Sequence, residues 1–167
     1  MSADWLFILC AALALGLDAW TKALVQSHFM LNESLPLLPG LALTYVRNPG
    51  AAFSLLANAP AQVRLPFFVA VTLGAGIAVL WMLKGTPKAD WLSRLGLGLV
   101  LGGAIGNAID RLRFMEVVDF IEVGVRGVYT WPVFNVADSA VCVGVGFLVW
   151  RAFFPLKAVQ AGEGGRA

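Results

Sequence analysis

The chain has 167 residues, of which 59% are hydrophobic and only 13% are charged. An average soluble domain carries about 25% charged residues, so this composition argues against a soluble fold and predicts a single membrane domain over residues 1–167. The formal charge is only +2 and no basic run is interleaved with aromatic residues, which argues against nucleic acid as a partner.

Several apolar runs are long enough to cross a bilayer, which takes about 20 helical residues. We expect transmembrane helices at about residues 5–25, 63–83, 91–112 and 133–154. Two longer segments, 26–62 and 113–132, then lie outside the spans, and a glycine-rich tail at 160–167 is expected to be disordered. The predicted fold class is an α-helical integral membrane protein.

The two longer segments contain short stretches rich in strand-forming residues. Residues 41–47 end at the turn signal Asn48-Pro49-Gly50, and residues 117–123 and 128–131 have a similar character. We therefore expect a small β-sheet on the extracytoplasmic membrane surface. The alternative is irregular loop.

Four spans place both termini on one side of the membrane. Residues 84–94 and 151–167 hold six Lys and Arg in 28 positions, against five in 61 for residues 26–64 and 111–132. Because Lys and Arg concentrate in cytoplasmic loops, we expect both termini in the cytoplasm and the two longer segments on the extracytoplasmic side.

Polar and charged residues from three spans converge on the extracytoplasmic end. They are Asp18 and Lys22 in the first span, Asn107, Asp110 and Arg111 in the third, and Asn135 and Asp138 in the fourth. The intervening segments add Asn48 and Asp119. Ionisable groups inside a membrane are costly and mark function by default, so this convergence predicts a site.

Two patterns within the spans also have a structural interpretation. Asp18 and Lys22 are four residues apart on one helix face, so an ion pair that merely holds the bundle together is the alternative to a catalytic role. Gly98, Gly102 and Gly106 repeat every fourth residue, which predicts close packing of the third span against a neighbouring helix.

The residue inventory excludes most hydrolytic chemistries. The one histidine, His28, has no zinc-binding pattern around it and no serine or cysteine partner to activate, so neither a metal nor a cofactor is expected. Two carboxylates that share a proton can activate water and polarise a peptide carbonyl without a metal. Spacing alone does not choose the pair from Asp18, Asp110, Asp119 and Asp138. Asp119 and Asp138 could both project into one pocket at the membrane edge, and the alternative is that each merely caps a helix or pairs with an arginine.

Five blocks of the sequence resemble lipoprotein signal peptidase, also called signal peptidase II, from the first span to the fourth. They are residues 18–22, 47–54, 102–111, 117–120 and 134–139. Their order and number make the resemblance specific, although any single block would be weak. The chain departs from the expected pattern at Met115-Glu116, where glycine and a basic residue are more usual, at Trp131, and at Pro49.

The resemblance implies an aspartyl endopeptidase with Asp119 and Asp138 as its catalytic pair. It implies that Asn48, Gly50, Asn107, Arg111 and Asn135 shape the pocket and bind substrate backbone, with Asp18, Lys22 and Asp110 in support. It also implies that the enzyme acts in the bacterial inner membrane. A monomer is expected, although the sequence does not determine the oligomeric state. The substrates of the enzyme would be prolipoproteins cut before a diacylglyceryl-modified cysteine, in contact with membrane lipid. Which aspartate holds the shared proton stays open.

Two other functions are compatible with membrane aspartates. A proton-coupled carrier would place its site near the bilayer midplane within repeated halves, whereas this chain has no repeat and its acids lie at one end. A structural or lipid-binding subunit would use the polar cluster for stability alone. That alternative predicts that Asp119→Asn unfolds the protein, whereas a peptidase would stay folded and become inactive.

Overall fold

The computed structural model describes residues 4–50, 59–125 and 127–156, and within them the chain forms four long helices. They are α1 (Asp4–His28), α2 (Ala61–Gly85), α3 (Trp91–Phe114) and α4 (Val136–Phe153). Each is long and apolar enough to span a membrane, and each covers a predicted span to within three residues at either end. The predicted fold class is therefore confirmed. The tail at 160–167 and positions 51–54 of the second sequence block lie outside the described residues.

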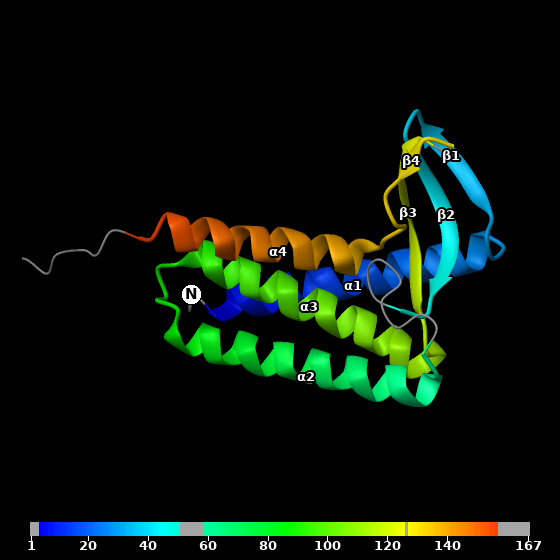
Figure 1. The fold of residues 1–167 in the computed structure, drawn as a ribbon. Helices are drawn as coiled ribbons and strands as arrows, with labels where there is room; N and C mark the ends of the chain where they lie inside the picture. Colours follow the sequence, from blue (N-terminus) through cyan, green and yellow to red (C-terminus); the bar gives the residue numbers. More distant parts are fainter. Residues whose placement is uncertain (1–3, 51–58, 126, 157–167) are drawn as a thin grey trace, which may run out of the picture.

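Helix α3 is the centre of the bundle and contacts α1, α2 and α4 (Figure 1). Its glycines allow the close approach that the sequence predicted, because a Cβ on Gly98 would lie 2.5 Å from the carbonyl oxygen of Phe7 in α1. On the α4 side, a Cβ on Gly103 would overlap the carbonyl oxygen of Ala137. A Cβ on Gly106 would lie 2.6 Å from Asp18 Oδ2, so this last glycine makes room for a charged side chain.

A small antiparallel sheet stands across one end of the bundle, and α1 begins and α4 ends at the opposite end (Figure 1). The strands follow the order β1 (Ser34–Leu38), β2 (Leu41–Asn48), β3 (Val117–Val125) and β4 (Tyr129–Thr130). The predicted small sheet is confirmed, and the alternative of irregular loop is wrong; the side of the membrane on which the sheet lies stays a prediction. The sequence missed β1, which contains Pro36; proline is tolerated there because β1 is an edge strand.

The sheet is fixed to α1 by a small apolar core. Val25 of α1 packs with Tyr45 of β2 and with Val118 and Phe120 of β3. Because alternate residues of a strand point to opposite faces, burying Val118 and Phe120 against this core turns Asp119 to the other face. The apolar pattern of β3 therefore sets the direction of its aspartate.

Met115 ends α3 in the left-handed conformation, with φ 60° and ψ 12°, and its side chain is exposed. A side chain at such a position costs roughly 1 kcal/mol that glycine avoids. We expect Met115→Gly to raise the thermal unfolding temperature by a few degrees in detergent or lipid. Met115→Ala is the matched control, because it removes the same contacts and keeps the strain. An equal rise in both variants would contradict the backbone explanation.

Candidate active site

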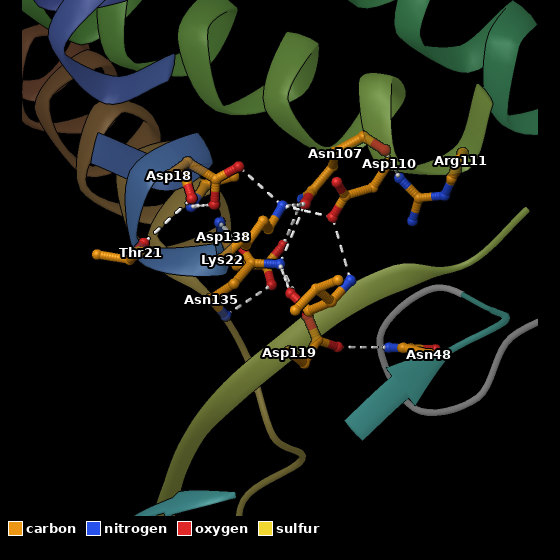
Figure 2. Close-up of polar contacts among 12 residues, drawn as sticks. Asp18, Thr21, Lys22, Asn48, Asn107, Asp110, Arg111, Asp119, Asn135 and Asp138 are labelled. Atoms are coloured by element: carbon orange, nitrogen blue, oxygen red, sulfur yellow. Dashed lines mark hydrogen bonds and ion pairs between the residues drawn. The ribbon is translucent and has the colours of Figure 1, made fainter. Parts of the chain in front are cut away.

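Asp119 lies in the middle of the polar cluster, on β3 and almost fully buried, at 1% exposure. Its Oδ2 accepts a hydrogen bond from Asn48 Nδ2 at 3.0 Å, and its Oδ1 accepts one from Asn135 Nδ2 at 2.7 Å (Figure 2). Both amides are oriented by backbone N–H groups, because Gly50 N donates to Asn48 Oδ1 and Asp138 N donates to Asn135 Oδ1. The two asparagines therefore present donors to Asp119.

Asp138 is the third residue of α4, and the start of that helix fixes its position. Asn135 is the N-cap: its Oδ1 accepts from Asp138 N at 2.8 Å, and Asp138 Oδ2 accepts from Asn135 N at 3.2 Å. This reciprocal pair is a capping box. The other oxygen, Asp138 Oδ1, accepts from Asn107 Nδ2 at 2.7 Å, which ties α4 to α3.

The chain segment before α4 is bound to β3 beside Asp119. Phe134 O accepts hydrogen bonds from the backbone N–H groups of Phe120 and Ile121, and Phe134 N donates to Ile121 O. Asn135 follows directly and is completely buried. Its Nδ2 reaches Asp119 Oδ1 and also Asn107 Oδ1 at 3.1 Å. The side-chain amide of Asn135 thus connects Asp119 with Asn107, the residue that binds Asp138.

Lys22 forms the centre of a buried ionic group next to Asp119 and Asp138, and this group contains the other two aspartates, Asp18 and Asp110. Its Nζ lies 2.7 Å from Asp18 Oδ2, 2.9 Å from Asp110 Oδ2 and 3.0 Å from Asn107 Oδ1 (Figure 2). The ion pair between Asp18 and Lys22 in α1 is therefore present, and it extends to α3 through Asp110. Each aspartate also accepts a backbone N–H from a site element: Asp18 Oδ1 from Ala137 in α4, and Asp110 Oδ2 from Val118 in β3. The group holds both elements that carry the catalytic candidates.

Arg111 lies at the edge of the cluster, next to the turn that follows β2. Its Nη2 donates to Gly50 O at 3.3 Å and its Nη1 to Asn107 O at 3.4 Å, both long contacts. The guanidinium carbon lies 4.3 Å from the ring centroid of Phe68 in α2. The sequence did not predict Phe68, since a phenylalanine inside an apolar span carries no signal of its own. All ten predicted site residues thus belong to one connected cluster.

A family model described as signal peptidase (SPase) II matches residues 10–154 of this chain. The chain belongs to the signal peptidase II family. Among its relatives, the lipoprotein signal peptidase of Syntrophus aciditrophicus is 50% identical over 145 residues, covering 86% of this chain and 89% of that protein. The lipoprotein signal peptidase of Moorella thermoacetica is 45% identical over 161 residues, covering 96% and 97%.

The fold is also shared with a solved bacterial membrane enzyme, at a TM-score of 0.80 and 28% identity over 94% of this chain and 93% of that one. Membership of the signal peptidase II family confirms the predicted family and the predicted aspartic peptidase activity. It does not favour the carrier or the structural subunit.

The surroundings of Asp119 in this signal peptidase II chain change its pKa. Burial is the main cause that raises the pKa of Asp119 from 3.8 to about 7, and the nearby charge of Asp138 acts in the same direction. Hydrogen bonds from Asn48 and Asn135 and the charge of Lys22 act in the opposite direction. At neutral pH a large fraction of Asp119 therefore carries a proton.

Among the described residues, no group of three or more His, Cys, Asp or Glu side chains is arranged to hold a metal ion. The lysine inside the cluster occupies the place where a cation would balance Asp18 and Asp110. A reaction without metal or cofactor stays a prediction.

Proposed function

We propose that this chain removes the signal peptide from diacylglyceryl-modified prolipoproteins, cutting before the lipidated cysteine, with Asp119 and Asp138 as its catalytic pair. The observation that carries the proposal is Asn135, which donates to Asp119 and caps the helix turn that contains Asp138. The names of the relatives support the substrate class, since they are lipoprotein signal peptidases.

The proposed reaction is general acid–base hydrolysis of one peptide bond. Ionised Asp138 takes a proton from water while the water oxygen attacks the scissile carbonyl carbon, and protonated Asp119 gives its proton to the carbonyl oxygen. The resulting diol collapses when Asp119 takes back a hydroxyl proton and Asp138 delivers its proton to the leaving nitrogen. The C–N bond then breaks, and both aspartates return to their starting states.

The remaining cluster residues are proposed to bind and orient substrate. Arg111 is suited to substrate carbonyls, because its two hydrogen bonds are long and its buried Nε has no partner among the described residues. Gly50 and Asn48 form the adjoining turn, and Asn107 and Asn135 hold the aspartates. The ionic group of Asp18, Lys22 and Asp110 would hold α4 and β3, the elements that carry the two aspartates, in place.

We further propose that the site faces the extracytoplasmic side of the bacterial inner membrane, with both termini in the cytoplasm and the enzyme acting as a monomer. The density of Lys and Arg at the terminal end supports this orientation. Exposed Trp81, Trp91 and Trp150 lie toward that same end, as aromatic residues do at a membrane interface. The active site then lies at the extracytoplasmic edge of the membrane. There it would hold the scissile bond of a substrate whose signal helix and acyl chains are both in the bilayer.

The raised pKa of Asp119 predicts the alkaline side of the pH profile. Because the proposed reaction needs a protonated Asp119, kcat/KM should fall as pH rises through about 7, approaching a tenfold loss per pH unit. The measurement is kcat/KM across pH with enzyme in lipid. As a control, enzyme held at the alkaline end is assayed again at neutral pH, which separates titration from inactivation. A rate that rises through pH 7 would contradict the assignment of Asp119.

The substrate proposal is tested by cleavage with purified protein from a host that lacks its own signal peptidase II. The precursor is prepared with and without the diacylglyceryl group on the cysteine. We expect cleavage directly before the cysteine in the modified precursor and at least about a hundredfold slower cleavage in the unmodified one, since remote binding energy serves catalysis. Equal cleavage of both would overturn the lipid requirement, and cleavage of neither would overturn the proposed function.

A further inference from the structure

The turn Asn48-Pro49-Gly50 follows the last paired residue of β2 and contacts Asp119 through the Asn48 side chain. The pairing of β2 with β3 ends at Asn48, opposite Val117. From there, Asn48 Nδ2 reaches Asp119 Oδ2 at 3.0 Å and Gly50 N closes back on Asn48 Oδ1 at 3.0 Å. The orientation of the Asn48 amide on Asp119 therefore depends on where the backbone of this turn is held.

Arg64 holds this turn from the side of α2. It is half-buried in the first turn of that helix, where its backbone N–H donates to Pro60 O at 3.1 Å. Its side-chain Nη1 donates to Pro49 O at 3.1 Å. Proline has no N–H of its own, so a hydrogen bond to its carbonyl is the one backbone bond by which this residue can be anchored.

Phe68 lies one helical turn after Arg64 and therefore on the same face of α2. It supports the guanidinium of Arg111, which in turn donates to Gly50 O at 3.3 Å. The two consecutive carbonyls of Pro49 and Gly50 thus each accept a hydrogen bond from an arginine. Arg64 belongs to α2, and Arg111 stacks on Phe68 of α2. This helix contributes none of the residues that the sequence predicted for the site.

We propose that Arg64 is a positioning residue of the peptidase, which holds the Pro49 carbonyl and so keeps the Asn48 amide on Asp119. The inference rests on the proposed function for its effect on cleavage. Arg64 does not touch either aspartate in the described contacts, and it acts through the turn.

Losing the hydrogen bond between Arg64 and the Pro49 carbonyl is expected to change the pKa of Asp119 in one direction. The hydrogen bond from Asn48 lowers the pKa of Asp119, so a displaced Asn48 amide would raise it. The other charged groups that act on Asp119 lie on separate elements: Lys22 on α1, Arg111 on α3 and Asp138 on α4. Of these, Arg111 is itself bound to the turn, through Gly50 O. A change in the titration of Asp119 would therefore report on the turn.

The test compares Arg64→Met, which keeps the length of the side chain without its donors, with Arg64→Lys, which keeps a donor. Arg113→Met is the matched control, because Arg113 is an exposed arginine near the same end of the bundle that stacks on Phe114. We expect Arg64→Met to lower kcat/KM about tenfold at neutral pH and to move the alkaline limb to higher pH. Arg64→Lys should restore part of both, and Arg113→Met should change neither.

A second readout needs no substrate. Infrared difference spectra between the wild type and Asp119→Asn isolate the carboxyl band of Asp119, and its titration is then followed in the Arg64→Met background. We expect a midpoint above that of the wild type. If the wild type does not cleave the lipidated precursor, the proposed function fails and this titration still decides the role of Arg64. An unmoved titration, or a loss of thermal stability with an unmoved pH limb, would overturn the inference.

Discussion

Asp119→Asn and Asp138→Asn are each expected to lower the rate of prolipoprotein cleavage by about a thousandfold or more while the protein stays folded. Asparagine has nearly the shape of aspartate, but it neither accepts a proton from water nor donates one to a carbonyl oxygen. Because the two carboxyls act in one step, the double variant should lose little more activity than either single one.

The thermal stability of the Asp119→Asn variant is expected to stay close to that of the wild type. The pKa of Asp119 is raised from 3.8 to about 7 in the folded protein, so the fold loses stability as pH rises from 3.8 to about 7, and the penalty stays constant above that. Asparagine removes that penalty but places its amide N–H₂ against the donor of one of the two residues Asn48 and Asn135, while its oxygen still accepts from the other. These effects oppose each other, so at alkaline pH the variant should melt within a few degrees of the wild type.

The two measurements are made on one preparation, with cleavage followed by mass analysis of the product and unfolding followed by a thermal scan in lipid. Inactive and folded variants would support the catalytic pair. Full activity in either variant would contradict the assignment. Variants that lose activity only because they unfold would favour a structural role for the cluster.

Much of this site could be predicted because a bilayer restricts the structures that an apolar segment can adopt. The apolar runs had to be helices of spanning length, and an even number of spans brings alternate helix ends to the same face. Asp18, Asn107 and Asp138 could therefore be placed at one end of the bundle before any contact was known. Their meeting in one cluster follows the same logic.

The connections inside the cluster could not be predicted in this way. The position of Asn135 beside Asp119 depends on the pairing of Phe134 with Ile121, a contact between irregular chain and a strand. β1 was missed because Pro36 weakens the strand signal, and its edge position is a property of the whole sheet. Arg64 was counted only as one charge among several, since its hydrogen bond to the Pro49 carbonyl depends on how α2 packs.

The choice of the catalytic pair shows a further limit. Spacing left four aspartates open, and the family resemblance selected Asp119 and Asp138. The structure separates the four by their partners: Asp18 and Asp110 share the ammonium group of Lys22, whereas Asp119 and Asp138 are held mainly by asparagine amides. The two pairs therefore differ in the chemical type of their partners, a difference that the spacing of the four aspartates does not contain.

Lys22→Met is expected to destabilise the protein by about 3–5 kcal/mol, because it leaves two buried carboxylates without their shared cation. Asp18 is 1% exposed and Asp110 is 7% exposed, so water cannot replace the ammonium group. Thermal unfolding in lipid should occur on the order of 10 °C lower. Cleavage should fall as well, because Asp18 anchors the start of α4 and Asp110 anchors the start of β3.

The matched control is the triple variant Lys22→Met, Asp18→Asn and Asp110→Asn. Each asparagine oxygen can still accept the backbone N–H of Ala137 or Val118, so the anchors remain while the buried charge disappears. Replacing all members of a buried ionic group is often nearly neutral, whereas removing one member is costly. The triple variant should therefore recover most of the lost stability. If it is as unstable as Lys22→Met alone, packing of the lysine side chain and not its charge holds the bundle. If Lys22→Met melts like the wild type, the ionic group contributes nothing to holding α4 and β3, and the positions of Asp119 and Asp138 must depend on the asparagine contacts and on the pairing of Phe134 with β3.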